Sequence, residues 1–383
     1  MINMNTSGIM KYKNYIFVSN DFGFGPISRL HTIASALARI DRSANIRIVS
    51  SGKTDYLFNN LDIKFDLIED LRSEEAIFQY IEKYNNLDTL IISSMNSFAI
   101  YVARTNNYTC VLLDGLYWFW KNRPQAFELA DIQYRFVLPW LLEKFQSEKT
   151  VKYFAGPVER YDYHTSNKGS KMLITVNGVV TPFYKPEHDS YIKLFMVLVN
   201  NICDNCSDLS VTGNKSINIL AKSYLRDDIK FNNYSKSEYA RSLYAADSVL
   251  LNGGSNSFLE TIVAKKDFLF ILPSNQSQYA LIDQVAQYTN KPIDFWCPAL
   301  TIIKNHEEIL DMANESSALD FMASIFDTIL ADKHLLNNMK KITKQIMLNI
   351  KEAKKQKIYL SFEESSAYSM NSASEVALEL SKI

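Results

Sequence analysis

Short apolar runs alternate with amphipathic segments along the first half of the chain. The runs at 90–92 and 111–113 are continuously apolar, which is typical of strands that are buried on both faces of a parallel sheet. Strands that alternate with helices predict an α/β domain whose sheet is covered by helices on both sides. The pattern predicts strands at 14–18, 45–49, 89–93 and 110–113, and helices at 28–40 and 73–84.

A second alternating series begins at residue 171, after a polar stretch that follows Gly156 and Pro157. It predicts strands at 171–176, 208–211, 217–220, 247–251 and 267–272, and helices at 191–201, 236–245, 256–265 and after 278. Two series of similar size predict two Rossmann-like domains that face each other across a cleft. We expect the first domain at 1–160, the second at 161–360, and a C-terminal helix within 361–383 that packs back on the first.

Charge and composition exclude several classes of protein. The 383 residues include 41 Lys and Arg against 42 Asp and Glu, so the net charge is -1 and no overall basic field exists to hold a nucleic acid. No window approaches the ~20 apolar residues of a membrane span, which leaves at most a peripheral contact with a membrane. Four scattered cysteines are too few for a disulfide framework and form a poor metal site. We therefore expect a cytoplasmic protein that binds no metal.

The first turn between a predicted strand and a predicted helix is rich in glycine. Residues 20–29 read N-D-F-G-F-G-P-I-S-R, with Gly23 and Gly25 beside the start of the helix. Glycines permit tight turning and close backbone approach, and free N–H groups at a helix start suit a phosphate, a carboxylate or a sugar hydroxyl. Taken alone, such a turn is equally typical of any α/β domain.

A second glycine-rich turn follows the strand predicted to end at Leu251. Gly253 and Gly254 precede a small polar triplet of Ser255, Asn256 and Ser257, and Glu260 follows inside the next helix. Such a turn can hold a diphosphate at the helix N-terminus, and the carboxylate can accept hydrogen bonds from a ribose diol. An alternative of equal weight is that Ser255 or Asn256 merely caps the helix and Glu260 is a solvated first-turn acid.

The segment from 246 to 286 resembles the donor-binding region of GT-B glycosyltransferases, especially the peptidoglycan GlcNAc transferase and the UDP-glycosyltransferase group. That family has four features in a fixed order along the chain: a Gly-Gly turn, a helix with a Glu, a strand ending in proline and a loop with Gln. The resemblance implies Ser255, Asn256 and Ser257 near the diphosphate, Glu260 on the ribose, and Gln276 or Gln278 on the donor sugar. We add Asn177 and Gly178, the turn that closes the first strand of this domain, to the donor-binding candidates.

The N-terminal turn is similar to the G-x-G-H-x-x-R loop of the same family, matching at Gly23, Gly25 and Arg29. Pro26 stands at the position of the family's histidine, which in many inverting members deprotonates the acceptor hydroxyl. Proline cannot take that proton. The resemblance makes the first domain the acceptor domain and the second the donor domain. The acceptor-binding candidates are Gly23, Phe24, Gly25, Arg29, Tyr117 and Trp118.

Two aspartates are the candidates for the missing base. Asp21 lies in the N-terminal turn, and Asp114 ends a predicted strand; strand carboxyl ends line the crevice of an open α/β sheet. Each aspartate is also well placed to cap a turn or a helix. Tyr117 and Trp118 belong to four consecutive aromatic residues, which favour either a stacking wall for an acceptor or an apolar core contact.

These observations predict a metal-independent glycosyltransferase that moves a sugar from a nucleoside diphosphate sugar, with a UDP-sugar as the expected co-substrate and no other cofactor. The acceptor stays open between a surface glycan or lipid-linked precursor, a small natural product and a nucleobase. Alternatives are a nucleotide-sugar hydrolase or epimerase of the same fold, and a non-catalytic partner subunit that retains the donor site. The sequence does not predict the oligomeric state.

Overall fold

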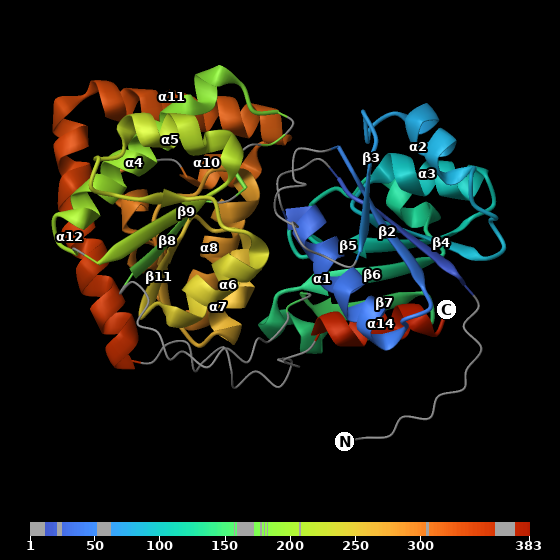
Figure 1. The fold of residues 1–383 in the computed structure, drawn as a ribbon. Helices are drawn as coiled ribbons and strands as arrows, with labels where there is room; N and C mark the ends of the chain where they lie inside the picture. Colours follow the sequence, from blue (N-terminus) through green and yellow to red (C-terminus); the bar gives the residue numbers. More distant parts are fainter. Residues whose placement is uncertain are drawn as a thin grey trace. The chain divides into compact units, whose positions relative to one another are not determined.

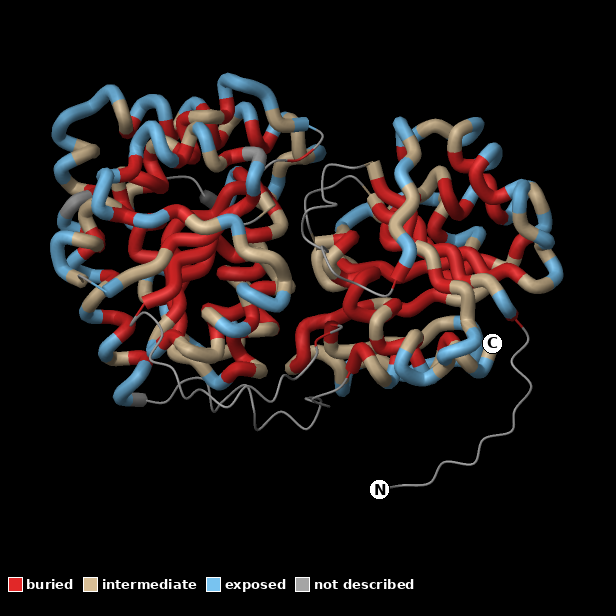
Figure 2. The backbone as a smooth tube through the Cα atoms, in the orientation of Figure 1, coloured by how far each residue is buried: buried red, intermediate tan, exposed pale blue. Residues whose placement is uncertain are grey.

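A computed structural model describes residues 12–20, 25–51, 63–156, 158, 172–176, 178–179, 181, 183–206, 208–303, 306–356 and 372–383. These residues form two compact units, each built on one parallel sheet (Figure 1). The buried residues concentrate in the strands and on the helix faces turned toward them (Figure 2). Each unit has its own hydrophobic core and is described by itself.

The first unit has seven parallel strands in the order β3-β2-β1-β4-β5-β6-β7. Its strands are β1 (Asn14–Val18), β2 (Asn45–Ser50), β3 (Lys64–Leu67), β4 (Thr89–Ser94), β5 (Thr109–Asp114), β6 (Ile132–Val137) and β7 (Val151–Ala155). Its helices are α1 (Gly25–Ile40), α2 (Glu74–Ile81), α3 (Ser97–Thr105) and α14 (Ser372–Ser381). The central strand β4 is buried along its whole length, as its continuously apolar sequence predicts.

Alternate side chains of β1 serve two different cores. Tyr15 and Phe17 pack with α1 and α14 on one face of the sheet, whereas Ile16 and Val18 pack with α2 and α3 on the other. The C-terminal helix α14 is held on the first unit by its apolar side chains, and its first residue, Ser372, donates a 2.5 Å hydrogen bond to the carbonyl of Gly156. The C-terminal helix therefore packs on the first unit, as predicted.

The second unit has five parallel strands in the order β10-β9-β8-β11-β12. Its strands are β8 (Met172–Val176), β9 (Leu209–Gly213), β10 (Phe231–Asn232), β11 (Ser248–Leu251) and β12 (Asp267–Phe270). Its helices are α4 (Asp189–Cys203), α5 (Asn218–Tyr224), α6 (Lys236–Ala245), α7 (Ser255–Val263), α8 (Gln276–Thr289), α9 (Ile293–Trp296), α10 (His306–Asp311), α11 (Glu315–Ala331) and α12 (Lys333–Gln356). Helices lie on both faces of this sheet as well (Figure 1).

The strand predicted at 217–220 is wrong, because this segment enters helix α5. Ile217 and Ala221 are buried and are four residues apart, so they lie on one face of a helix, while Ile219 is 84% exposed. The third strand of this unit is instead β10, which has only two residues and therefore leaves almost no pattern in the sequence.

Both sheets reverse their strand order beside their first strand, between β1 and β4 in the first unit and between β8 and β11 in the second. In open α/β sheets, ligands bind outside the carboxyl ends of the strands at such a switch point. The topology therefore marks one candidate site in each unit. In the part of the chain that the structure describes, no helix is long and apolar enough to cross a membrane.

Candidate functional site

The switch point of the second unit is formed by two glycine turns. Gly178 follows β8 and Gly253 follows β11, and these two strands are direct neighbours in the sheet. Gly178 has φ of +70° and Gly253 has φ of +96°, a region that side-chain-bearing residues rarely adopt. Only glycine fits both turns without strain, so the two turns can bring bare backbone to the crevice.

Gln278 lies between the two glycines. A Cβ atom at Gly253 would stand 3.0 Å from Cβ of Gln278, and one at Gly178 would stand 3.6 Å from its Nε2. Its Oε1 accepts hydrogen bonds from the backbone N–H of Ser274 at 2.7 Å and from the Ser274 hydroxyl at 3.1 Å. Asn275, the N-cap of α8, donates from Nδ2 to the carbonyl of Gly178 at 3.4 Å. The structure thus brings Gly178, Gly253 and Gln278 together; Asn177 lies outside the described residues.

Helix α7 starts at this turn with no side-chain cap. Its N-cap is Gly254, so neither Ser255 nor Asn256 caps the helix as the sequence alternative proposed. Asn256 and Glu260 are four residues apart and partly exposed, so they lie one above the other on one face of the helix. Ser257 is buried and faces the interior. The N-terminus of α7 combines a positive dipole end with accessible polar groups, which suits an anion.

Gln276, the other glutamine proposed for the donor sugar, serves the interior of the unit. Its Nε2 donates to the carbonyls of Ile309 at 2.8 Å, Leu310 at 3.3 Å and Met312 at 3.0 Å. These bonds tie the start of α8 to the end of α10, and the side chain is 7% exposed. Gln278 is also buried, at 3% exposed, but it lies against Gly178 and Gly253 at the switch point, so it is the glutamine of the two that stays the donor-sugar candidate.

A half-buried glutamate that the sequence analysis did not single out lies beside Gln276, with its Oε1 shielded from solvent. Glu315 is the first residue of α11. Burial raises the pKa of its carboxyl from 4.5 to about 8, while a hydrogen bond from the backbone N–H of Gln276 favours the charged form. Folding therefore favours the protonated carboxyl, and this costs stability wherever the unfolded chain would be ionised.

The raised pKa predicts a dependence of stability on pH. Below about pH 4.5 both states hold the proton; above it the unfolded chain loses the proton that the folded chain keeps, so the free energy of unfolding falls until about pH 8. One group contributes at most about 1.4 kcal/mol per pH unit. We expect Glu315→Gln to gain stability relative to the wild type between pH 5 and 8 in urea unfolding. The exposed Glu308→Gln is the control, and parallel curves for wild type and Glu315→Gln would contradict the assignment.

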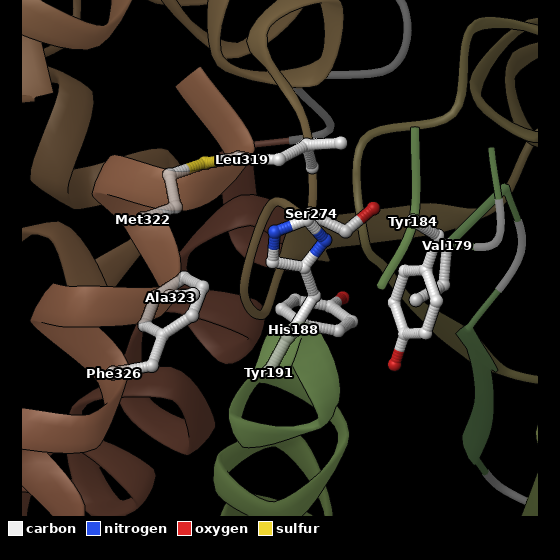
Figure 3. A pocket seen from close by; sticks show the side chains of 9 residues that line it. All are labelled: Val179, Tyr184, His188, Tyr191, Ser274, Leu319, Met322, Ala323 and Phe326. Atoms are coloured by element: carbon white, nitrogen blue, oxygen red, sulfur yellow. The ribbon is translucent and has the colours of Figure 1, made fainter. Parts of the chain in front are cut away.

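A small pocket lies behind the loop that carries Ser274 (Figure 3). Four apolar side chains of α11 and Tyr191 of α4 form much of its wall, and the hydroxyl of Tyr191 donates to the carbonyl of Leu272 at 2.8 Å. The lining residues are Val179, Tyr184, His188, Tyr191, Ser274, Leu319, Met322, Ala323 and Phe326. The pocket is lined neither by the glycines of the two turns nor by Glu260. We therefore infer that its residues support the loop and do not form the donor site.

In the first unit, Arg29 of α1 is buried beneath the carboxyl ends of two strands. Its guanidinium contacts Sδ of Met95, just after β4, at 3.7 Å and the carbonyl of Gly115, just after β5, at 3.5 Å. Burial lowers the pKa of Arg29 to about 10, and the charge of Asp114 opposes this shift. A Cβ at Gly115 would overlap the guanidinium. Arg29 therefore supports the loop ends, while Asp21, Gly23 and Phe24 lie outside the described residues and Gly25 begins α1.

Asp114 is fully buried and paired. Its Oδ2 accepts from Nε of Arg123 at 2.9 Å, and its Oδ1 accepts from the indole of Trp120 at 3.1 Å and the backbone of Leu116 at 3.3 Å. Burial raises the pKa of Asp114, and the Arg123 guanidinium opposes that shift. These surroundings match the turn-capping alternative, so Asp114 is not carried forward as a catalytic base.

Tyr117 and Trp118 face different surroundings. The Tyr117 ring lies under the guanidinium of Arg135 at 4.7 Å and beside the ring of Tyr153 at 5.6 Å, whereas Trp118 contacts Phe119. The aromatic run is therefore not one stacking wall. Sequence reasoning missed Arg123 and Arg135, because their shared partner, Gln133, lies on β6, a strand that the apolar pattern did not reveal.

Comparison with known proteins identifies the fold. No protein-family model matches the sequence, and no curated protein matches it. The chain is similar to the structure of S. aureus MnaA with UDP, with a TM-score of 0.51 and 13% identity over 98% of each chain. It is similar to Acinetobacter baumannii MurG, with a TM-score of 0.50 and 11% identity over 97% of this chain and 100% of that one. The spinosyn rhamnosyltransferase SpnG matches with a TM-score of 0.50 and 9% identity, over 90% of this chain and 99% of its own. These similarities confirm that the chain has the GT-B fold, with two Rossmann-like domains.

Proposed function

We propose that this protein is a glycosyltransferase that takes a sugar from a nucleoside diphosphate sugar, with UDP as the nucleotide, and transfers it to an acceptor without a metal ion. The observation that carries the proposal is the pair of positive-φ glycines at the β8/β11 switch point, beside the uncapped N-terminus of α7. The same fold in MnaA, solved with UDP, supports the choice of nucleotide.

In this proposal each group at the donor site has its own role in the transfer. The backbone N–H groups at the start of α7 stabilise the negative charge that develops on the leaving diphosphate, as fixed dipoles can in place of a metal. Glu260 accepts hydrogen bonds from the ribose diol, one helical turn further along. Gln278 is 3% exposed and its Oε1 is held by Ser274, so we assign contact with the sugar to its Nε2, which lies beside Gly178. The acceptor heteroatom attacks the anomeric carbon as the bond to the diphosphate breaks, and Asp21 is the remaining candidate for its proton.

A thermal-shift screen against UDP, GDP, dTDP, CMP and their sugars tests the donor site. A ligand at ~100 times its Kd adds ~2.7 kcal/mol to the free energy of unfolding, which raises Tm measurably. We expect UDP and one UDP-sugar to raise Tm, and Glu260→Ala to remove the increase. Glu187→Ala changes an exposed carboxylate in the same unit and is expected to keep it.

Turnover separates the remaining functions. Release of UDP that requires an added acceptor supports transfer, release without any acceptor points to a hydrolase, and a Tm increase without release points to a binding subunit. No Tm increase with any nucleotide, in protein shown to be folded, would overturn the proposed function.

A further inference from the structure

Helix α12 presents two chemically different faces. One face is buried against α4 and β12 through residues such as Met339, Ile342 and Ile346. The opposite side of the helix is exposed to solvent (Figure 2). Its outer side chains therefore do not contribute to the core of the second unit.

The exposed side carries a line of lysines, which we name the lysine strip. At 100° per residue, its members fall within a sector of about 80°. The strip consists of Lys333, Lys341, Lys344, Lys351 and Lys355, with the 59% exposed Leu348 among them. From the first to the last lysine it extends over roughly 33 Å at 1.5 Å per residue. It contains no acidic, aromatic or arginine side chain.

Most charges of the strip do not stabilise the helix itself. None of its five ammonium groups forms a hydrogen bond or ion pair with another described residue. Lys351 and Lys355 are four residues apart, a spacing at which like charges destabilise a helix. Lys333 stands at the N-terminal end of α12, where the helix dipole disfavours a cation. Lys355, in the last turn, is the one lysine of the strip that the helix dipole favours. Helix stability therefore does not explain the whole row, and five cations in one line with no partner among the described residues indicate a polyanionic partner.

We propose that the lysine strip docks this protein on an anionic lipid surface. Lysines close to such a surface are attracted additively, and a straight row of them can engage a plane at the same time. Leu348 supplies an apolar side chain in the middle of the row, where it can enter the lipid interface. A nucleic-acid site would favour arginine forks and stacking aromatics, which the strip lacks. The whole chain has a net charge of -1, so the strip also sets the orientation of docking.

Vesicle sedimentation of the full chain tests the proposal. Vesicles of phosphatidylcholine alone are compared with vesicles that contain roughly 30% phosphatidylglycerol, a composition that gives a strongly negative surface. We expect binding only to the anionic vesicles and its loss in high salt. Lys341→Gln/Lys344→Gln/Lys351→Gln should weaken the partition coefficient by roughly 100-fold. Leu348→Ser should weaken it further at unchanged charge.

The matched control removes three exposed lysines elsewhere, as Lys149→Gln/Lys222→Gln/Lys230→Gln, and is expected to bind nearly as well as the wild type. Equal losses for both triple variants would overturn the strip as the docking surface. If folded wild-type protein does not bind anionic vesicles, the proposal is overturned. Binding to heparin or to RNA in that case would indicate a polyanion other than a lipid surface. Nucleotide-induced Tm increases are measured in parallel, so failure here is distinct from failure of the donor site.

Discussion

Replacing Arg123 with methionine is expected to lower the free energy of unfolding by about 3–5 kcal/mol. The substitution removes the cation that faces Asp114, whose side chain is 0% exposed, and leaves a buried carboxylate without its counter-charge. It also frees Oε1 of Gln133 from one of its donors. Urea unfolding monitored by tryptophan fluorescence measures the loss directly.

The double variant Arg123→Met/Asp114→Asn separates charge from packing. The asparagine keeps an oxygen for the indole of Trp120 but carries no charge, so it should recover a large part of the lost stability. A loss below about 1 kcal/mol in the single variant would show that Asp114 is not held as a buried anion. In that case Asp114 would return as a candidate for proton transfer.

Replacing Gly253 with alanine is expected to abolish the increase in Tm produced by UDP. The residue has φ of +96°, where a side chain costs roughly 1–2 kcal/mol, and its new Cβ would meet Cβ of Gln278 at 3.0 Å. The turn would have to shift away from Gln278, and the backbone would no longer approach the diphosphate closely. Differential scanning fluorimetry with and without UDP measures both the stability and the binding.

Gly254→Ala is the matched control. Gly254 has an ordinary φ of -65°, and a Cβ there would meet only Oδ1 of Asn252, at 3.9 Å. We expect this variant to lose up to about 1 kcal/mol at the N-cap, where alanine is much less favoured than glycine, and to retain the response to UDP. If both variants lose the UDP-induced increase in Tm equally, the ligand contacts the whole turn and the positive φ of Gly253 has no special role. A Gly253→Ala protein that still responds fully would contradict the role of this glycine.

The buried elements of the fold follow from local pattern. The predicted strand 14–18 matches β1 at both ends, and the predicted helix 236–245 matches α6, whose capping box of Ser235 and Glu238 is a local signal. Strands buried on both faces need uninterrupted apolar runs, which make them visible in the sequence. Two strands that the sequence pattern did not predict lack such runs. Strand β3 is an edge strand with exposed ends, and in β6 the polar residues Gln133 and Arg135 alternate with apolar ones.

The chemical groups of the candidate site could be predicted from the sequence: glycines at strand ends, a polar helix start and a carboxylate one turn further along. These are local requirements of backbone and charge. The contacts of each side chain, by contrast, come from the tertiary fold. It placed Gln278 between two glycines 100 and 25 residues away along the chain, and directed Gln276 to the α10 carbonyls. It also neutralised Asp114 with Arg123. Such pairings depend on which strands become neighbours, and strand order arises from long-range packing that no local pattern encodes.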